Sequence, residues 1–152
     1  MELSKISETY SLNRSTYINL RWIGIIGQLI TINSVKFILG FDFDFITANL
    51  IIFLGGISNI FLIYYYNKIQ LSNRSSLNFL LIDIIQLSAL LYLTGGVVNP
   101  FSIFLLIPSV FASSHLKIKT NLFLIFVTLI SIIFLTFFSL DLPKPLSEHF
   151  HV

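Results

Sequence analysis

The residues with the clearest chemical potential form an uncharged break between two long apolar runs, Gly95-Gly96-Val97-Val98-Asn99-Pro100-Phe101. Glycine can adopt the positive φ that ends a helix, and proline has the φ suited to opening the next one. Asn99 precedes a proline, which favours the extended geometry of an N-cap whose side chain accepts a hydrogen bond from a helix amide. The spacing therefore predicts that one helix ends at Gly95 and Gly96 and that another begins at Pro100.

The start of that second helix is suited to bind an oxygen atom. Its first amides have no partner within the helix and lie at the positive end of the helix dipole. A quinone head group, which carries two carbonyls on an apolar ring, matches such amides with flat apolar walls beside them. The candidate quinone-binding residues are Tyr92, Gly95, Gly96, Asn99, Pro100 and Phe101. A tight turn without a ligand is the alternative, since Gly, Asn and Pro are ordinary turn residues.

Composition indicates a membrane protein. Of the 152 residues, 55% are hydrophobic and 11% are charged, whereas soluble domains are about half apolar and about a quarter charged. The nine basic residues are scattered among short loops, so we expect no nucleic-acid partner. The chain has no cysteine, which excludes a thiol switch and leaves redox sensing to a bound small molecule. No zinc-binding, nucleophile-elbow or phosphate-loop motif indicates catalytic residues.

Five apolar runs are predicted to cross the membrane as helices. They cover residues 17–39, 45–66, 77–94, 100–114 and 121–140, and the fourth is short and interrupted by Pro108. Residues 1–16 form a polar amino-terminal segment, and residues 141–152 form a polar tail. A cytoplasmic amino terminus places seven of the nine Lys and Arg residues on the inner side, as the positive-inside rule favours. The sequence therefore predicts an all-α membrane protein, a bundle of five transmembrane helices with a cytoplasmic amino terminus and the tail outside.

Asp83 is the only acidic residue within an apolar run. A carboxylate at the centre of a membrane helix costs about 2.5–3.5 kcal/mol on insertion scales, so it needs a partner or a function. We favour a salt bridge or hydrogen bond to Arg21 or Arg74 over a proton relay to the quinone site. Polar residues within spans also leave open a second function, a small transporter or channel subunit. The residues that permit it are Gln28, Asn59, Asp83 and Gln86.

Two blocks of the sequence resemble a known family. The first runs from Leu20 to Gln28 (LRWIGIIGQ), and the second runs from Asp83 to Phe101 and is followed by Ile107-Pro108. Both resemble the membrane sensor region of the RegB/PrrB redox-sensing histidine kinases, and the second contains their GGxxNPF heptapeptide. The likeness extends from about residue 20 to the fifth apolar run.

The resemblance implies ubiquinone sensing at Gly95 to Phe101 and control of autophosphorylation in a cytoplasmic kinase domain. It also implies a homodimer formed through the kinase region, a response regulator as partner, and a location in a bacterial inner (plasma) membrane. The apolar spans themselves predict contact with membrane lipid. Such kinases have a sixth span, a phosphoacceptor helix and an ATP-binding domain, which this sequence lacks. We therefore expect the sensor portion of a kinase, without a catalytic site. His149 and His151 in the tail are a weak metal signal, and we expect no metal site.

Overall fold

Short polar side chains set where the long helices begin. The computed structural model describes residues 12–66 and 70–145. The side chain of Asn13 accepts a hydrogen bond from the Thr16 amide at the start of the first helix. Asp44 and Ser72 cap the next two helices in the same way, which satisfies amides that have no partner within the helix. The α-helices are α2 (Arg14–Phe37), α3 (Phe45–Tyr65), α4 (Asn73–Leu93), α5 (Ile107–His115) and α6 (Ile118–Phe137).

The connections between the helices are short. Two 3-10 helices, η1 (Gly96–Val98) and η2 (Pro100–Leu106), join α4 to α5. The helix type changes at Ile107, beside Pro108, where the sequence predicts an interruption. Two pairs of two-residue antiparallel strands close the ends of the bundle. Strand β1 (Leu12–Asn13) pairs with β3 (Gln70–Leu71), and β2 (Phe41–Asp42) pairs with β4 (Lys144–Pro145).

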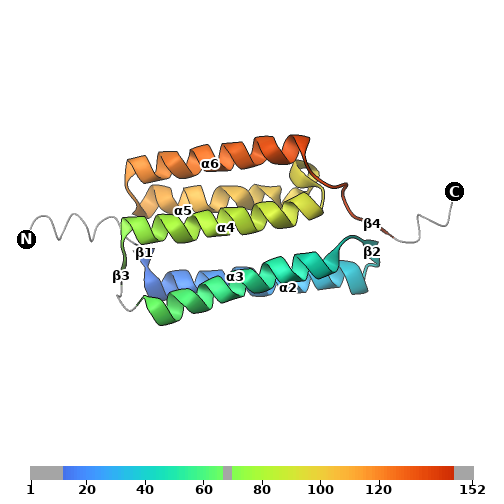
Figure 1. Ribbon diagram of the computed structural model, residues 1–152, viewed down its shortest axis with the longest axis horizontal. Helices are drawn as coiled ribbons and strands as arrows, with labels where there is room; N and C mark the ends of the chain where they lie inside the picture. Colours follow the sequence, from blue (N-terminus) through green and yellow to red (C-terminus); the bar gives the residue numbers. More distant parts are fainter. Residues whose placement is uncertain (1–11, 67–69, 146–152) are drawn as a thin grey trace, which may run out of the picture.

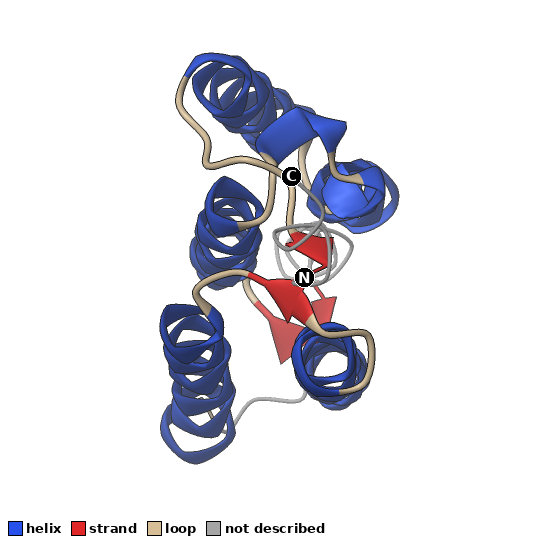
Figure 2. Cartoon of the chain, turned by 90° about the vertical axis from the view of Figure 1, so that its right-hand side faces the viewer, coloured by secondary structure: helices blue, strands red, loops and turns tan. Residues whose placement is uncertain are grey.

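Helix α4 occupies the middle of the bundle (Figure 1). It packs against α3 on one side and against α5 and α6 on the other, while α2 packs on α3 and α5 packs on α6. Figure 2, which looks along the helices, shows these two groups on either side of a central helix. The main core cluster joins both groups, and its fully buried members include Leu62 of α3, Ile84 and Leu91 of α4, Leu105 of η2 and Leu124 of α6. The two pairs, α2–α3 and α5–α6, are thus held together through α4.

Three of the described helices have the length and apolar composition of membrane spans, namely α3, α4 and α6. Helix α2 is longer, at 24 residues, but Arg21, Gln28 and Asn33 make it more polar. The segment Pro100–His115 is apolar but shorter. Helix α4 begins at Asn73, four residues before the predicted boundary, because Ser72 caps it there. The predicted all-α fold is confirmed, and three of the five predicted crossings meet the length and hydropathy expected of a span.

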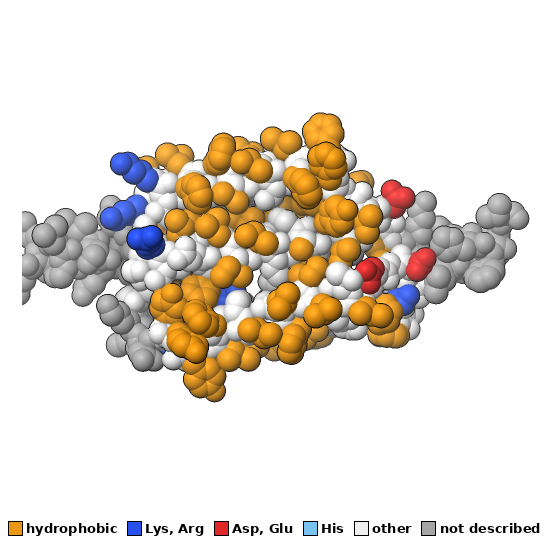
Figure 3. Space-filling model, in the orientation of Figure 1, with side chains coloured by type: hydrophobic (Ala, Val, Ile, Leu, Met, Phe, Trp, Pro, Cys, Tyr) orange, Lys and Arg blue, Asp and Glu red, His pale blue; other side chains and the backbone are white. Residues whose placement is uncertain are grey.

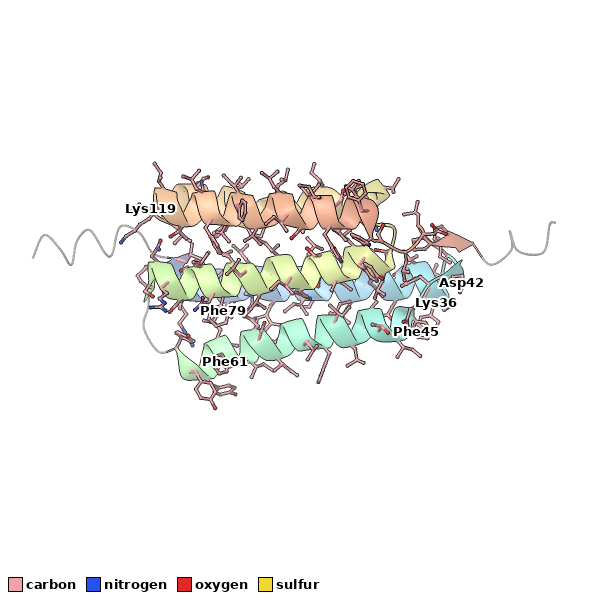
Figure 4. All side chains as sticks on the ribbon, turned by 45° about the horizontal axis from the view of Figure 1, so that its top comes forward. Lys36, Asp42, Phe45, Phe61, Phe79 and Lys119 are labelled. Atoms are coloured by element: carbon pink, nitrogen blue, oxygen red, sulfur yellow. The ribbon has the colours of Figure 1, made fainter. Side chains whose placement is uncertain are left out.

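Apart from Arg21 and Asp83 inside the bundle, the charged residues of the described part of the chain lie at its two ends (Figure 3). One end, here called the basic end, carries Arg14, Arg74, Lys117 and Lys119 at or beside the starts of α2, α4 and α6. The opposite, acidic end carries Asp42, Asp44 and Asp141, together with Lys36. Figure 4 labels Lys119 at the basic end and Lys36 and Asp42 at the acidic end. Between the ends the surface is largely apolar (Figure 3), as contact with lipid acyl chains requires.

Some predicted features lie outside the described residues. Most of the predicted amino-terminal segment, residues 1–11, and the end of the predicted tail, residues 146–152, belong to this group. They include the histidine pair His149 and His151. Within the described residues, no group of three or more His, Cys, Asp or Glu side chains is placed to hold a metal ion.

Candidate ligand-binding site

The glycine-to-proline turn adopts the conformation that its residues predict. Gly95 and Gly96 have positive φ values of 106° and 63°, which glycine adopts without a steric penalty. A Cβ atom on Gly95 would lie 2.9 Å from the Cα of Leu142, and one on Gly96 would lie 2.6 Å from the Ser139 hydroxyl. These glycines therefore end α4 and also let the segment after α6 pass close to the turn.

Asn99 caps the helix that follows, as predicted. Its Oδ1 accepts a hydrogen bond from the Phe101 amide at 2.9 Å, and its backbone carbonyl accepts from the Ser102 amide at 2.9 Å. Its Nδ2 donates to both oxygens of Thr94, the carbonyl at 3.0 Å and the hydroxyl at 3.1 Å. The two side-chain hydrogens of Asn99 and the first two amides after Pro100 thus already have acceptors within the turn.

Three of the six candidate residues line a cavity of about 820 Å³, and three do not. Asn99, Pro100 and Phe101 lie on its wall. Tyr92 instead stacks on Phe134 of α6, with ring centroids 6.3 Å apart. Gly95 and Gly96 face the segment that follows α6, as described above. The second half of the turn, from Asn99 to Phe101, therefore faces the cavity.

The cavity extends along the bundle between α2 and the η2–α5 segment, with α4 as its floor. Near the acidic end it is bounded by Phe41, Phe43, Leu142 and Pro143, which belong to the paired strands or lie beside them. Toward the basic end it reaches Tyr17, Arg21 and Asp83. The cavity wall formed by α2 has no side chain at Gly24 and Gly27, and a Cβ atom added at either position would meet no other atom within 4 Å.

The rim of the cavity is open to the surface of the bundle. Several of its apolar lining residues are about half exposed, and they belong to both α2 and the η2–α5 segment. They are Leu20, Ile23, Phe101, Phe104 and Ile107. In a bilayer this surface contacts acyl chains, so an apolar ligand can enter sideways from the lipid.

A network of polar side chains lies at the cavity's deeper end. Arg21 forms a salt bridge with Asp83, with an N–O distance of 2.9 Å. The predicted pairing of Asp83 is therefore confirmed, and its partner is Arg21 and not Arg74. Tyr17 donates to the other carboxylate oxygen at 2.6 Å. Arg21 also donates to Ser58 at 2.6 Å and to Asn59 at 3.5 Å. This network, here called the Arg21 network, joins α2, α3 and α4.

A second polar feature lies one turn further along α4. Gln86 Nε2 donates to Gln28 Oε1 at 2.8 Å, and both side chains line the cavity. The pair connects α4 to α2 between the Arg21 network and the glycine-to-proline turn. The cavity thus combines apolar walls with a few polar groups, as small-molecule sites usually do.

The chain is 30% identical over 128 residues to the sensor histidine kinase RegB of Cereibacter sphaeroides. The match covers 84% of this chain and 28% of that protein, so the chain spans less than a third of the relative's length. No protein-family model matches the chain, and no solved structure matches it significantly. The similarity supports a role as a membrane sensor.

The sequence did not predict that Asp83 and Asn99 line one cavity. Because Asp83 and the glycine-to-proline turn are far apart along the helix, they were expected near opposite faces of the membrane. At 1.5 Å per residue, about 16 Å does separate Asp83 from Thr94, which precedes the turn. A repeating pattern on α2 could have indicated the shared wall. Small and polar residues recur on one face of that helix at helical spacing. They are Gly24, Gly27, Gln28 and Thr31, and all four line the cavity.

Proposed function

We propose that this chain is the membrane sensor portion of a two-component histidine kinase and that it reports redox state by binding a quinone in the cavity. The observation that carries the proposal is the cavity itself, whose wall includes Asn99, Pro100 and Phe101 of the heptapeptide and whose rim faces lipid. A quinone dissolved in the bilayer reaches such a rim without crossing water. The similarity to a sensor histidine kinase supports the signalling role.

The proposed topology has five crossings, with the basic end in the cytoplasm of a bacterial inner membrane. The four cations of the basic end support this orientation, because positive residues collect on the cytoplasmic side. A cytoplasmic kinase domain and its homodimer then belong to a larger parent protein, and a response regulator is the partner of that protein. The shorter Pro100–His115 segment and the more polar α2 would cross as members of the bundle, with their polar groups turned toward other helices.

The proposed signal is a difference in binding between the oxidised and reduced quinone. A ligand shifts a conformational equilibrium only by its difference in affinity for the two states. The cavity is suited to this because its two walls, α2 and η2–α5, belong to the two groups that α4 holds together. A ligand between them changes how the groups pack, and a connected kinase domain would respond to that packing.

A cavity-filling variant tests this proposal. Gly27→Leu places a side chain in the cavity without meeting protein atoms near its Cβ, and Gly56→Leu is the control because Gly56 is equally unobstructed but lies outside the cavity. The chain's one tryptophan, Trp22, lies half-buried on α2, so quenching of its fluorescence by a short-chain ubiquinone analogue reports binding. We expect Gly27→Leu to weaken binding by at least about tenfold, or about 1.4 kcal/mol. Equal binding by Gly27→Leu and Gly56→Leu would contradict the proposal.

The geometry does not favour the transporter or channel alternative. Asn59, one of the residues that suggested it, accepts a hydrogen bond from Arg21 and donates one to the Ile18 carbonyl at 3.3 Å. Asp83 is held by Arg21 and Tyr17. Solute flux in liposomes that is abolished by Asp83→Asn remains the observation that would support a transport function.

A further inference from the structure

Within residues 12–66 and 70–145, two pairs of side-chain amides form hydrogen bonds between helices, and one of the two pairs is saturated. Asn33 and Asn49 exchange hydrogen bonds at 2.9 and 3.2 Å between α2 and α3. Each Nδ2 also donates to the carbonyl four residues earlier in its own helix, at 2.8 Å. All four amide hydrogens of this pair therefore have acceptors, and neither side chain lines the cavity.

The pair formed by Gln28 and Gln86 is different. It makes one hydrogen bond, from Gln86 Nε2 to Gln28 Oε1. Among the described residues, nothing accepts from Gln28 Nε2 and nothing donates to Gln86 Oε1. Both side chains are half-buried and line the cavity. Unpaired polar groups in a membrane interior are costly, so the pair presents a donor and an acceptor that a ligand can satisfy.

The amide of Gln86 is held firmly in place. A Cβ atom on Gly55 of α3 would lie 2.6 Å from Gln86 Nε2 and 2.7 Å from its Cδ. The absence of a side chain at Gly55 is therefore what allows the Gln86 amide to lie against the backbone of α3. Contact with Gly55 and the bond to Gln28 fix the amide from two helices, as a binding group should be fixed.

The glycine-to-proline turn has less hydrogen-bonding capacity left for a ligand. Both Asn99 side-chain hydrogens and the Phe101 and Ser102 amides already have acceptors within the turn. Gln86 lies about 12 Å from Thr94 along α4, at 1.5 Å per residue. A single carbonyl oxygen of a bound quinone can therefore accept a hydrogen bond at Gln86 or at the turn, but not at both.

We infer that the Gln28–Gln86 pair holds an oxygen of the quinone head group, while Pro100 and Phe101 form an apolar wall of the same cavity. This inference rests on the proposed function and adds the position and the polar partners of the ligand. A quinone oxygen only accepts hydrogen bonds, so it takes one from Gln28 Nε2. A hydroquinone hydroxyl also donates, and Gln86 Oε1 accepts from it. The two redox forms thus use different atoms of the pair.

Near-isosteric substitutions test this assignment. Gln28→Met and Gln86→Met keep a long side chain but remove its amide, and Asn49→Leu does the same for the saturated pair. Binding of a short-chain ubiquinone analogue and of its hydroquinone is measured by Trp22 fluorescence for each variant. We expect Gln28→Met to weaken binding of the quinone by about tenfold and binding of the hydroquinone by less. Gln86→Met should weaken binding of the hydroquinone more than binding of the quinone. Asn49→Leu should bind both forms like the wild type.

The outcomes separate the inference from the proposed function. If both methionine variants bind like the wild type while Gly27→Leu does not bind, the assignment is wrong and the proposed function stands. If Gly27→Leu binds normally, the proposed function is wrong. Should a methionine variant fail to fold, Gly55→Ala replaces it, because the added Cβ displaces the Gln86 amide, with Gly56→Ala as its control. Weaker binding by Gly55→Ala alone supports the assignment, and equal binding by both overturns it.

Discussion

The two ends of the cavity are stabilised in different ways. At the deeper end, the Arg21 network joins side chains that lie 37 to 66 residues apart in the sequence. At the other end, the hydrogen bonds of Asn99 connect residues no more than five positions apart. The Arg21 network thus depends on the packing of three helices. The hydrogen bonds of Asn99 are local to the turn, although the turn also packs against the segment that follows α6.

This difference indicates which end transmits a change and which end only shapes the cavity. Arg21 is 7% exposed, and its guanidinium lies 5.6 Å from the Tyr17 ring centroid and 5.4 Å from that of Phe79. Losing one partner there leaves a charge without compensation in a membrane interior. Losing a bond in the turn affects η2 and leaves the contacts among α2, α3 and α4 intact. Variants at the deeper end should therefore loosen the whole bundle.

The largest effect is expected from Asp83→Leu. The substitution leaves the Arg21 guanidinium buried without its carboxylate, and breaking a buried ion pair in this way costs about 3–5 kcal/mol. The measurement is the free energy of unfolding of the chain in mixed detergent micelles, without ligand. We expect a loss within that range and a single cooperative transition.

The double variant Arg21→Leu with Asp83→Leu is the control for that prediction. A buried ion pair can often be replaced by apolar side chains with little loss of stability, so the double variant should recover most of the loss. If Asp83→Leu unfolds like the wild type, the Arg21 network does not hold the three helices together.

Local features of this molecule were predictable from sequence because they depend on neighbouring residues. The cap at Asn99 and the helix that begins at Pro100 follow from the preferences of Asn, Pro and Gly, and the structure confirms both. The apolar runs predicted the helices for the same reason, although the Ser72 cap moved the start of α4 from residue 77 to Asn73.

Tertiary features were only partly predictable. Nothing in the sequence favoured Arg21 over Arg74 as the partner of Asp83, because that choice depends on how α2 packs near α4. The cavity depends on the space between α2 and the η2–α5 segment, which no local pattern specifies. The sequence predicted that the Asn99 side chain caps one amide of the new helix and that the other first amides suit a ligand oxygen, whereas the side chain and the carbonyl of Asn99 bind the first two amides after Pro100.

A smaller effect is expected from Asn99→Ala. Removing an N-cap side chain costs about 1 kcal/mol, and here the bonds to Thr94 are lost as well. The unfolding free energy should fall by about that amount, less than for Asp83→Leu, and hydrogen exchange of the Phe101 amide should become faster. The comparison variant is Asn99→Asp, which keeps the acceptor for that amide but has no hydrogens for Thr94.

The two Asn99 variants distinguish the cap from the bonds to Thr94. Slow exchange of the Phe101 amide in Asn99→Asp, with fast exchange in Asn99→Ala, supports the cap. A loss of stability in Asn99→Ala as large as that in Asp83→Leu would show that the turn also holds the whole bundle, and the contrast between the two ends would not stand.

The smallest effect is expected from a second carboxylate, Asp44, at the acidic end. Its side chain is solvent-exposed, and hydrogen bonds from the Thr47 hydroxyl at 2.6 Å and the Thr47 amide at 3.1 Å hold its pKa below the ordinary value. A carboxyl whose pKa is lower in the folded state adds stability above its unfolded pKa, and this contribution is lost as the pH falls through the folded pKa. The unfolding midpoint should therefore drop slightly as the pH is lowered below about 4.

The comparison with Asp44→Asn isolates this contribution from other acidic groups. Asparagine is also a good N-cap, so the variant keeps an acceptor for the Thr47 amide but does not titrate. The difference between the wild-type and variant midpoints should be constant above about pH 5 and should shrink below about pH 4. An unchanged difference across this range would mean that the Asp44 charge adds nothing to helix α3, and the cap would then act through its hydrogen bonds alone.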